Sequence, residues 1–440
     1  MKIHLINVWD RLVSGFWFVP LGMTLCMGIL AVGLSVLDIR TEFDPLVALF
    51  GIDMTPGAAQ GLLTTIITAE VSLASIVFSV TILTLSIASS QFGPRLMRTF
   101  LTDVYTQIAL GAFVSTSVYC LLVLVVVRED GDAAFVPHLS VLFALAAAVF
   151  GLCFLVYFIH RIAHLIQAAE VVESVAWDLD RAVIRLFPEV LEGPVEPVEP
   201  PAGPPDGECA TVHALREGYL QGVDALVLAQ CARQNDCVLR LLHRPGRYVV
   251  RGTAIAEAAP PTVNTEKLAK AVDAALVYGN RRTPRQDVEC TILELAEVAV
   301  RALSPGINDP FTALNCIDRL SGGLARLATR QPPNPCHHDE DGQLRLVLQP
   351  ETFASALDAA FNQIRQYGRE SVAILIRLLE ALATIAPFAR RPEDLDALMR
   401  HGDMVLSAME RTIAEENDRT DIRERHDLLR EVVAQARAAE

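Results

Sequence analysis

The stretch LLTTIITAEVSLASIVFSVTILTLSIASS, residues 62–90, decides the fold. It is long and apolar enough to cross a bilayer as an α-helix. Hydroxyl side chains recur in it at alternating steps of three and four, which places them on one stripe of a helix. These residues are Thr65, Thr68, Ser72, Ser75, Ser79, Ser86 and Ser89, with Ile82 interrupting the series. The stretch therefore predicts a membrane-spanning helix with a polar stripe.

One carboxylate, Glu70, lies in the same apolar stretch and points away from the stripe. Polar groups in hydrocarbon need partners in the protein or in water. Two interpretations stay open. Small and hydroxyl residues favour close packing of helices and bonds back to their own backbone. Alternatively, the helix lines a solute pathway, whose candidate residues are Glu70, Thr65, Thr68, Ser72, Ser75, Ser79 and Ser86.

Composition separates the chain into two parts. The 440 residues include an apolar excess that is concentrated in the first 160, and the remainder has the composition of a soluble protein. The net charge of −15 and the absence of a basic stripe exclude nucleic-acid binding. Nine cysteines without a Cys-x-x-Cys pair indicate reduced thiols and no disulfide framework.

Four spans of about 20 apolar residues are predicted in the first part. They are Phe16–Leu37, Leu62–Ser86, Gln107–Val127 and Leu139–Ile159. Positive charges gather beside the ends that precede the first span and follow the second and fourth, at Lys2, Arg11, Arg95, Arg98 and Arg161. The opposite loops are rich in Asp and Glu. This asymmetry predicts a multi-pass protein of the bacterial inner membrane, in contact with the lipid bilayer, with both termini in the cytoplasm.

The second part is predicted to be a cytoplasmic α+β region, a small β-barrel-like module plus a helical bundle. The residues GYLQ (218–221) and RPGRYVVRG (244–252) are similar to the small barrel modules of biotinyl and lipoyl domains. No lysine occurs between residues 211 and 258, so no carrier group and no cofactor is expected. The predicted domains are a transmembrane domain 1–160, a helical stalk 161–187 continuing the fourth span, a Pro/Glu-rich linker 188–210, a β-rich module 211–258 and a helical domain 259–440.

Two groups of metal-binding residue types occur, and neither predicts a metal site. His160 and His164 are one helical turn apart without a third ligand, which favours an interfacial role. Cys336, His337, His338, Asp339, Glu340 and Asp341 are consecutive on a predicted Pro-rich, solvated loop, so the sequence implies no rigid ligand geometry there.

The segment 281–313 has two predicted helix starts. Thr283, Pro284 and Gln286 have the pattern of a capping box, and Asp309-Pro310 is a second N-cap and N1 pair. Local structure leaves Arg281, Arg282, Asp287, Arg301 and Asn308 unexplained. With Asp309 these form a predicted cytoplasmic polar cluster, which either pins two helix starts together or binds a small anion. No catalytic constellation accompanies it.

Several segments are similar to one bacterial family. They are VYTQ (104–107) with LG (110–111), GYLQ (218–221) with Asp224, and above all RALSPGINDPFTA (301–313). The chain resembles the predicted membrane proteins grouped as domain of unknown function 2254. The resemblance implies a membrane part followed by a cytoplasmic domain, and it implies no activity.

Three functions are considered. The first is an ion channel or transporter that assembles as a homo-oligomer, because four spans are too few for a conventional pathway, with a small ion as its ligand. The second is a non-transporting scaffold or sensor whose helical domain binds partners. An enzyme ranks last, because the sequence displays no nucleophile or metal set.

Overall fold

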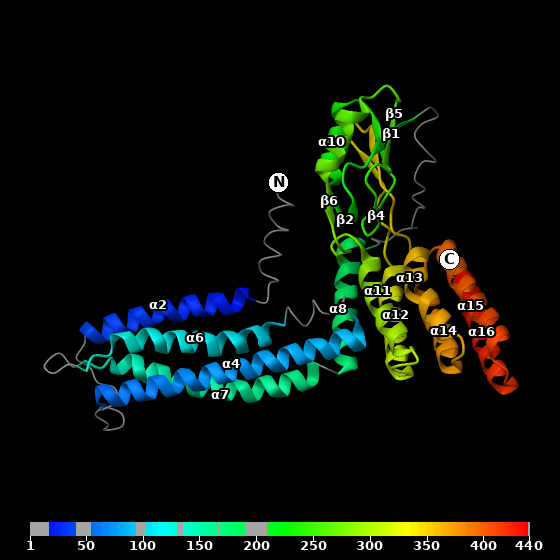
Figure 1. Ribbon diagram of the computed structural model, residues 1–440. Helices are drawn as coiled ribbons and strands as arrows, with labels where there is room; N and C mark the ends of the chain where they lie inside the picture. The colour runs from blue at the N-terminus through cyan, green and yellow to red at the C-terminus, as the bar shows by residue number, and fades with distance from the viewer. Residues whose placement is uncertain are drawn as a thin grey trace. The chain divides into compact units, whose positions relative to one another are not determined.

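The computed structural model describes residues 17–40, 54–93, 103–129, 135–165, 167–189 and 209–438. The chain divides into two compact units, Met1–Gln167 and Ala168–Glu440, which are considered separately (Figure 1). Lys2, Arg11, Arg95 and Arg98, from which the orientation is predicted, lie outside the described residues. So does most of the predicted linker 188–210.

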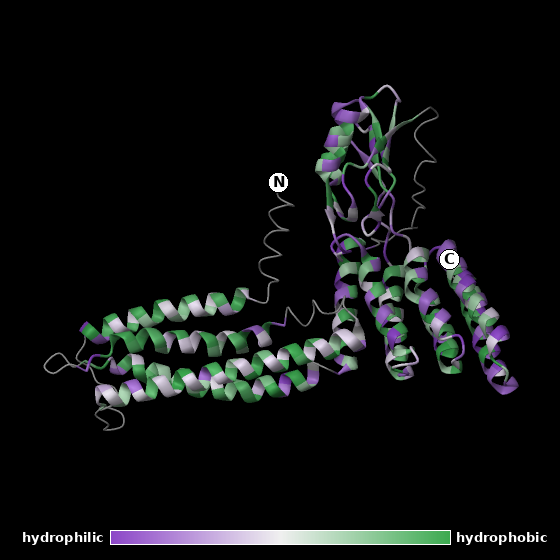
Figure 2. Cartoon of the chain, in the orientation of Figure 1, coloured by the Kyte–Doolittle hydropathy of each residue, from purple (hydrophilic) through white to green (hydrophobic). Residues whose placement is uncertain are grey.

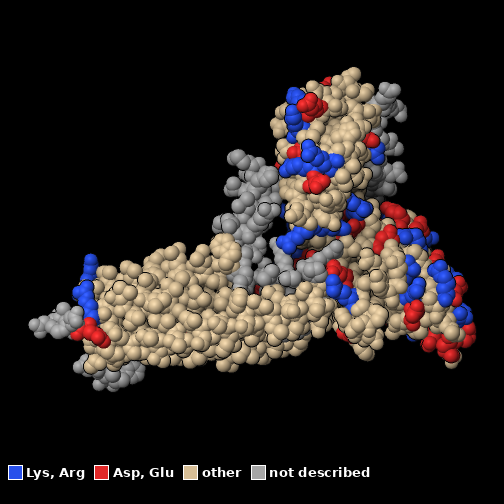
Figure 3. Space-filling view, in the orientation of Figure 1, with Lys and Arg blue, Asp and Glu red and all other residues tan. Residues whose placement is uncertain are grey.

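Unit 1 consists of long apolar helices. They are α2 (Phe18–Arg40), α4 (Pro56–Phe92), α6 (Val104–Val126) and α7 (His138–Leu165). Each is long and apolar enough to cross a membrane, so the described residues contain the four predicted spans. Apolar residues run along all four helices in Figure 2, and the face seen in Figure 3 has no charged side chains between the helix ends.

Helix α4 is longer than a bilayer requires. It begins after Thr55, whose hydroxyl accepts a hydrogen bond from Ala58 N, and it ends at Gly93, whose φ of 101° suits glycine. Its 37 residues extend for about 55 Å at 1.5 Å per residue, against a hydrocarbon core of about 30 Å. The helix therefore tilts or extends beyond the hydrocarbon.

Helix α6 is the centre of unit 1, because it contacts α2, α4 and α7 and is the most buried span. Small residues permit this close packing. At Gly111 a Cβ atom would lie 2.6 Å from Met23 Sδ and 3.1 Å from Pro20 Cα, so glycine is required where α2 crosses α6.

Hydrogen bonds to one carboxylate fix the end of α2 against the start of α7. The buried Asp38 carboxylate accepts hydrogen bonds from Leu139 N (3.0 Å), Ser140 N (3.0 Å) and Ser140 Oγ (2.6 Å). Tyr119 Oη donates to Ser140 O at 3.0 Å. Asp38 therefore takes the place of an N-cap residue for α7, from another helix.

Unit 2 is an α+β region. Its helices are α8 (Ala168–Leu186), α9 (Ala225–Gln234), α10 (Thr265–Ala275), α11 (Val288–Ala302), α12 (Pro310–Ala328), α13 (Phe353–Tyr367), α14 (Val372–Ile385), α15 (Pro392–Thr412) and α16 (Glu416–Ala438), with the short 3₁₀ helix η2 (Ala386–Phe388). Helices α8 and α11 to α16 pack side by side (Figure 1). The predicted stalk 161–187 is divided between the end of α7 at Leu165 and α8, which packs on α11 and α12.

Two open sheets replace the predicted barrel-like module. The strands are β1 (Ala210–His213), β2 (Gly218–Val223), β3 (Val238–Leu241), β4 (Tyr248–Val249), β5 (Ala254–Ala259), β6 (Leu276–Gly279), β7 (Cys336–His338) and β8 (Leu344–Val347). One sheet has the order β1-β5-β3-β8-β7 and is antiparallel except between β3 and β8, and the other has the order β4-β2-β6. The barrel prediction is wrong for the described residues, because β6, β7 and β8 come from beyond residue 258 and extend separate sheets. Helices α9 and α10 contribute Leu228 and Leu268 to the core that the sheets share.

Replacement of Asp38 tests this anchor of unit 1. Asp38→Ala is expected to lower the free energy of unfolding of unit 1 by about 1–2 kcal/mol, the usual range for loss of a helix cap. Asp38→Asn keeps one acceptor oxygen and is expected to lose less. Titration of the full-length protein from a mild into a denaturing detergent measures both. Equal stability of Asp38→Ala and the parent contradicts the capping role.

Candidate functional site

Glu70 is a buried acid in the interior of unit 1. Its side chain is 2% exposed and lies near the middle of α4. A Cβ atom placed on Gly151 of α7 would be 3.3 Å from Glu70 Oε1 and 3.3 Å from Phe113 of α6, so the carboxyl group is enclosed by three helices. Glu70 Oε2 has no hydrogen-bond partner among the described residues. A buried carboxyl without partners is costly, and in a membrane span it usually marks a functional position.

The hydroxyl stripe of α4 lies on the outside of unit 1. All six candidate hydroxyl residues, Thr65, Thr68, Ser72, Ser75, Ser79 and Ser86, are exposed in the single chain. Five of them donate to the backbone carbonyl four residues earlier, at distances between 2.7 and 3.0 Å. These five hydroxyls are therefore satisfied by their own helix and need neither water nor another helix.

The predicted pathway residues thus divide between two faces of α4. Glu70 faces the other spans, whereas the hydroxyls face away from them. The structure does not bring the acid and the stripe together within one chain. The helical spacing already placed Glu70 off the stripe, but it did not show which face the other spans cover.

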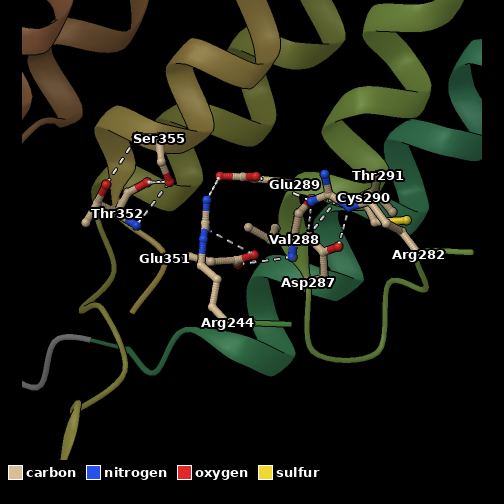
Figure 4. Close-up of polar contacts among 10 residues, drawn as sticks. All are labelled: Arg244, Arg282, Asp287, Val288, Glu289, Cys290, Thr291, Glu351, Thr352 and Ser355. Carbon is tan, nitrogen blue, oxygen red and sulfur yellow. Dashed lines mark hydrogen bonds and ion pairs between the residues drawn. The ribbon is translucent and has the colours of Figure 1, made fainter. Parts of the chain in front are cut away.

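A second polar cluster lies in unit 2, at the start of α11 (Figure 4). Arg282 binds Asp287 in bidentate fashion, with Nε to Oδ2 and Nη2 to Oδ1 both at 2.7 Å. Asp287 is 1% exposed and caps α11 by accepting from Cys290 N at 3.1 Å. Gly246 lies against this pair with a φ of 90°, a position where any side chain would meet Asp287 and Arg282. The predicted pair Arg282 and Asp287 is therefore in direct contact.

Three further residues complete the cluster, and the sequence did not indicate them. Arg244, from the turn between β3 and β4, donates to Glu289 Oε1 at 2.5 Å, and its Nη1 lies 3.6 Å from Glu351 Oε1. Glu351 Oε2 accepts from Val288 N at 3.1 Å, which satisfies the first amide of α11. Arg282 Nη2 also approaches Glu289 at 3.3 Å. Two arginines and three carboxylates thus join the sheets to the starts of α11 and α13.

The other predicted cluster residues lie elsewhere. Arg281 is exposed and its carbonyl accepts from Gln221 Nε2. Arg301, Asn308 and Asp309 lie at the opposite end of α11, about 22 Å away along 15 residues.

One of the two predicted caps is wrong. Helix α11 begins at Val288 with Asp287 as its N-cap, not at Pro284. Gln286 bonds instead to both backbone groups of Val223 on β2, at 2.7 and 3.1 Å. The predicted Asp309-Pro310 start of α12 is confirmed.

In the described part of the chain, no group of three or more His, Cys, Asp or Glu side chains has an arrangement that could hold a metal ion. The rings of His160 and His164 stack edge to face, 4.7 Å apart. Cys336–His338 form strand β7 rather than part of a loop. Asp339 binds Arg345 at 2.7 Å and accepts from two amides of the β7–β8 turn.

Burial and charge act differently on the two glutamates of the cluster. Burial raises the pKa of Glu351 to about 8, and the neighbouring Asp287 carboxylate adds to this rise. Burial opposes ionisation of Glu289 too, but Arg244 and Ser355 bind it and hold its pKa below the usual value. The cluster thus holds two strongly paired carboxylates and one that is protonated at neutral pH.

Comparison with known proteins places most of the chain in one group. The family described as "Predicted membrane protein (DUF2254)" matches residues 13–384. The uncharacterized proteins Rv1290c of Mycobacterium tuberculosis and Mb1321c of Mycobacterium bovis are each 33% identical over 424 residues, which cover 94% of this chain and 79% of theirs. No solved structure matches the chain.

A pH series tests the state of Glu351. Because its pKa is raised in the folded chain, the folded state retains a proton that the unfolded state has released. The contribution of Glu351 to the stability of unit 2 is therefore greatest at or below the ordinary glutamate pKa and is lost as pH rises towards 8. Glu351→Gln is expected to remove most of this decline, and the exposed Glu393→Gln is the control. Thermal unfolding of the full-length protein in detergent measures it, and an unchanged pH profile in Glu351→Gln contradicts the assignment.

Proposed function

The chain belongs to the DUF2254 family of predicted membrane proteins, and from that premise we propose that it is an oligomeric ion channel or transporter of the bacterial inner membrane. In this proposal the termini and unit 2 lie in the cytoplasm, where unit 2 regulates the membrane part. Protonation of Glu70 controls transport. The observation that supports this most is the buried Glu70 carboxyl group, whose Oε2 atom lacks a partner among the described residues.

The position of Glu70 suggests how it acts. It lies against Gly151 and Phe113, where gain or loss of a charge changes the packing energy of three spans far more than at an exposed site. Its single carboxylate offers too few oxygen atoms to enclose a dehydrated metal cation. We therefore assign Glu70 the role of a proton-binding residue that alters the packing of α4, α6 and α7.

The hydroxyl stripe then serves contacts between copies. It faces outward on α4, so α4 helices of several chains can gather around an axis with the stripe along it. Small and hydroxyl residues permit such close approach. In that assembly Glu70 lies on the side of α4 that faces away from the axis. Its protonation state then affects the pathway along the axis by changing the orientation of α4.

A non-transporting scaffold or sensor is the second candidate, and one observation favours it. The five hydroxyls from Thr65 to Ser79 are satisfied within their own helix, so they do not require a water-filled path. In this case the spans anchor the protein, and Glu70 affects assembly or stability alone.

Flux measurements separate the two candidates. In proteoliposomes under an imposed pH gradient or voltage, the parent protein is expected to pass ions, and Glu70→Gln is expected to reduce the rate at least about tenfold, as expected for a functional intramembrane acid. The exposed Glu129→Gln, at the end of α6, is the matched control and is expected to retain the parent rate. Absence of flux in the parent under every gradient rejects transport and favours the scaffold or sensor. Equal flux in the parent and Glu70→Gln rejects the role of Glu70.

A further inference from the structure

The turn between α11 and α12 has an uncharged, partly apolar surface. Phe311 is 79% exposed and Ile307 is 41% exposed. Pro305, Gly306 and Asn308 are exposed beside them. None of these five residues is ionisable. We call Pro305–Phe311 the 305–311 tip.

Hydrogen bonds fix the shape of the tip. Asp309 N donates to Ala302 O at 2.8 Å, and Asn308 N donates to Ser304 O at 2.9 Å. The Asp309 carboxylate caps α12 by accepting from the amide and the hydroxyl of Thr312. The one acid of the tip is therefore engaged in local structure, while Phe311 is held outward on the first turn of a helix.

The tip lies at the end of unit 2 where the chain enters it. Helices α8 and α12 run in the same direction, because Arg319 pairs with Glu173 at 3.7 Å and Arg326 pairs with Asp180. In both pairs the arginine of α12 follows its partner in α8 by the same number of residues. The same spacing places Ala168, the first residue of α8, level with Leu314. Phe311 precedes that residue by three positions, which places it about 4.5 Å beyond the start of α8.

The covalent chain keeps the start of α8 close to the end of α7. Helix α8 starts at Ala168, three residues after the end of α7, which is the fourth candidate span. Three residues of extended chain reach at most about 11 Å. Whatever angle α8 adopts, its first residue remains within that reach of the end of α7.

We propose that the 305–311 tip docks on the lipid surface, with Phe311 and Ile307 inserted at the boundary of headgroups and acyl chains. Aromatic and aliphatic side chains favour this zone. The one acid of the tip, Asp309, is bonded to Thr312, and the side chains proposed to insert carry no charge. A lipid surface is chosen over a protein partner because the short tether joins this end of unit 2 directly to a candidate membrane span. The contact is independent of transport through Glu70.

Fluorescence quenching by brominated lipid tests the proposal in the full-length protein. The three native tryptophans, Trp9, Trp17 and Trp177, are first replaced by phenylalanine. Phe311→Trp and, separately, Ile307→Trp then introduce one probe each. In nanodiscs with acyl chains brominated near the headgroup, their emission is expected to fall about twofold relative to unbrominated nanodiscs, as for a side chain inserted at the interface.

Phe388→Trp is the matched control. Phe388 is 47% exposed and lies at the opposite end of unit 2, where Arg391 Nη1 donates to Arg330 O just beyond the end of α12. Its emission is expected to be unaffected by bromination. Equal emission in both lipids for Phe311→Trp and Ile307→Trp overturns the proposal, as does equal quenching of the control. A variant that retains Trp177 as its single tryptophan reports on the outer face of α8. Quenching of Trp177 without quenching at the 305–311 tip also overturns the proposal.

Discussion

Hydrocarbon offers no hydrogen-bond partners, so each polar group of unit 1 must find one within the protein. Most of the described groups do. The stripe hydroxyls of α4 bond to their own backbone, and Asp38 of α2 takes the free amides at the start of α7. Tyr119 reaches the carbonyl of Ser140. Glu70 departs from this rule at the middle of the helices, because one of its oxygen atoms is buried without a partner among the described residues.

The features that the sequence predicts well depend on short stretches of chain. The four spans follow from runs of apolar residues, the end of α4 from Gly93, and the start of α12 from Asp309 and Pro310. The sheets could not be predicted in this way. Strands β6 and β8 pair with β2 and β3, many residues earlier, and β7 joins its sheet only through β8. The sequences of these strands give only short signals. The start of α11 was misplaced because Thr283 and Asp287 are both suitable N-caps, and only the contact of Gln286 with β2 decides between them.

The same limit applies to the polar cluster of unit 2. Arg282 and Asp287 are five residues apart, so a contact between them is within reach of the sequence. Arg244 and Glu351 join them only through the packing of the β3–β4 turn against two helix starts. Arg301 and Asp309 were grouped with Asp287 by proximity in the chain, although α11 separates them by its whole length. Residues that are close in sequence can therefore lie at opposite ends of a domain when a helix separates them.

Glu351 and Glu70 are both buried acids, yet their surroundings give them different significance. Glu351 has a structural role, because it satisfies the first amide of α11 and lies beside Arg244 within the polar cluster of unit 2. Glu70 satisfies no such group and pairs with no cation among the described residues. A residue of similar shape without charge would pack against Phe113 and Gly151 at no electrostatic cost. Stability therefore accounts for Glu351 but not for Glu70, whose buried carboxyl group is explained by the proton-binding role proposed for it.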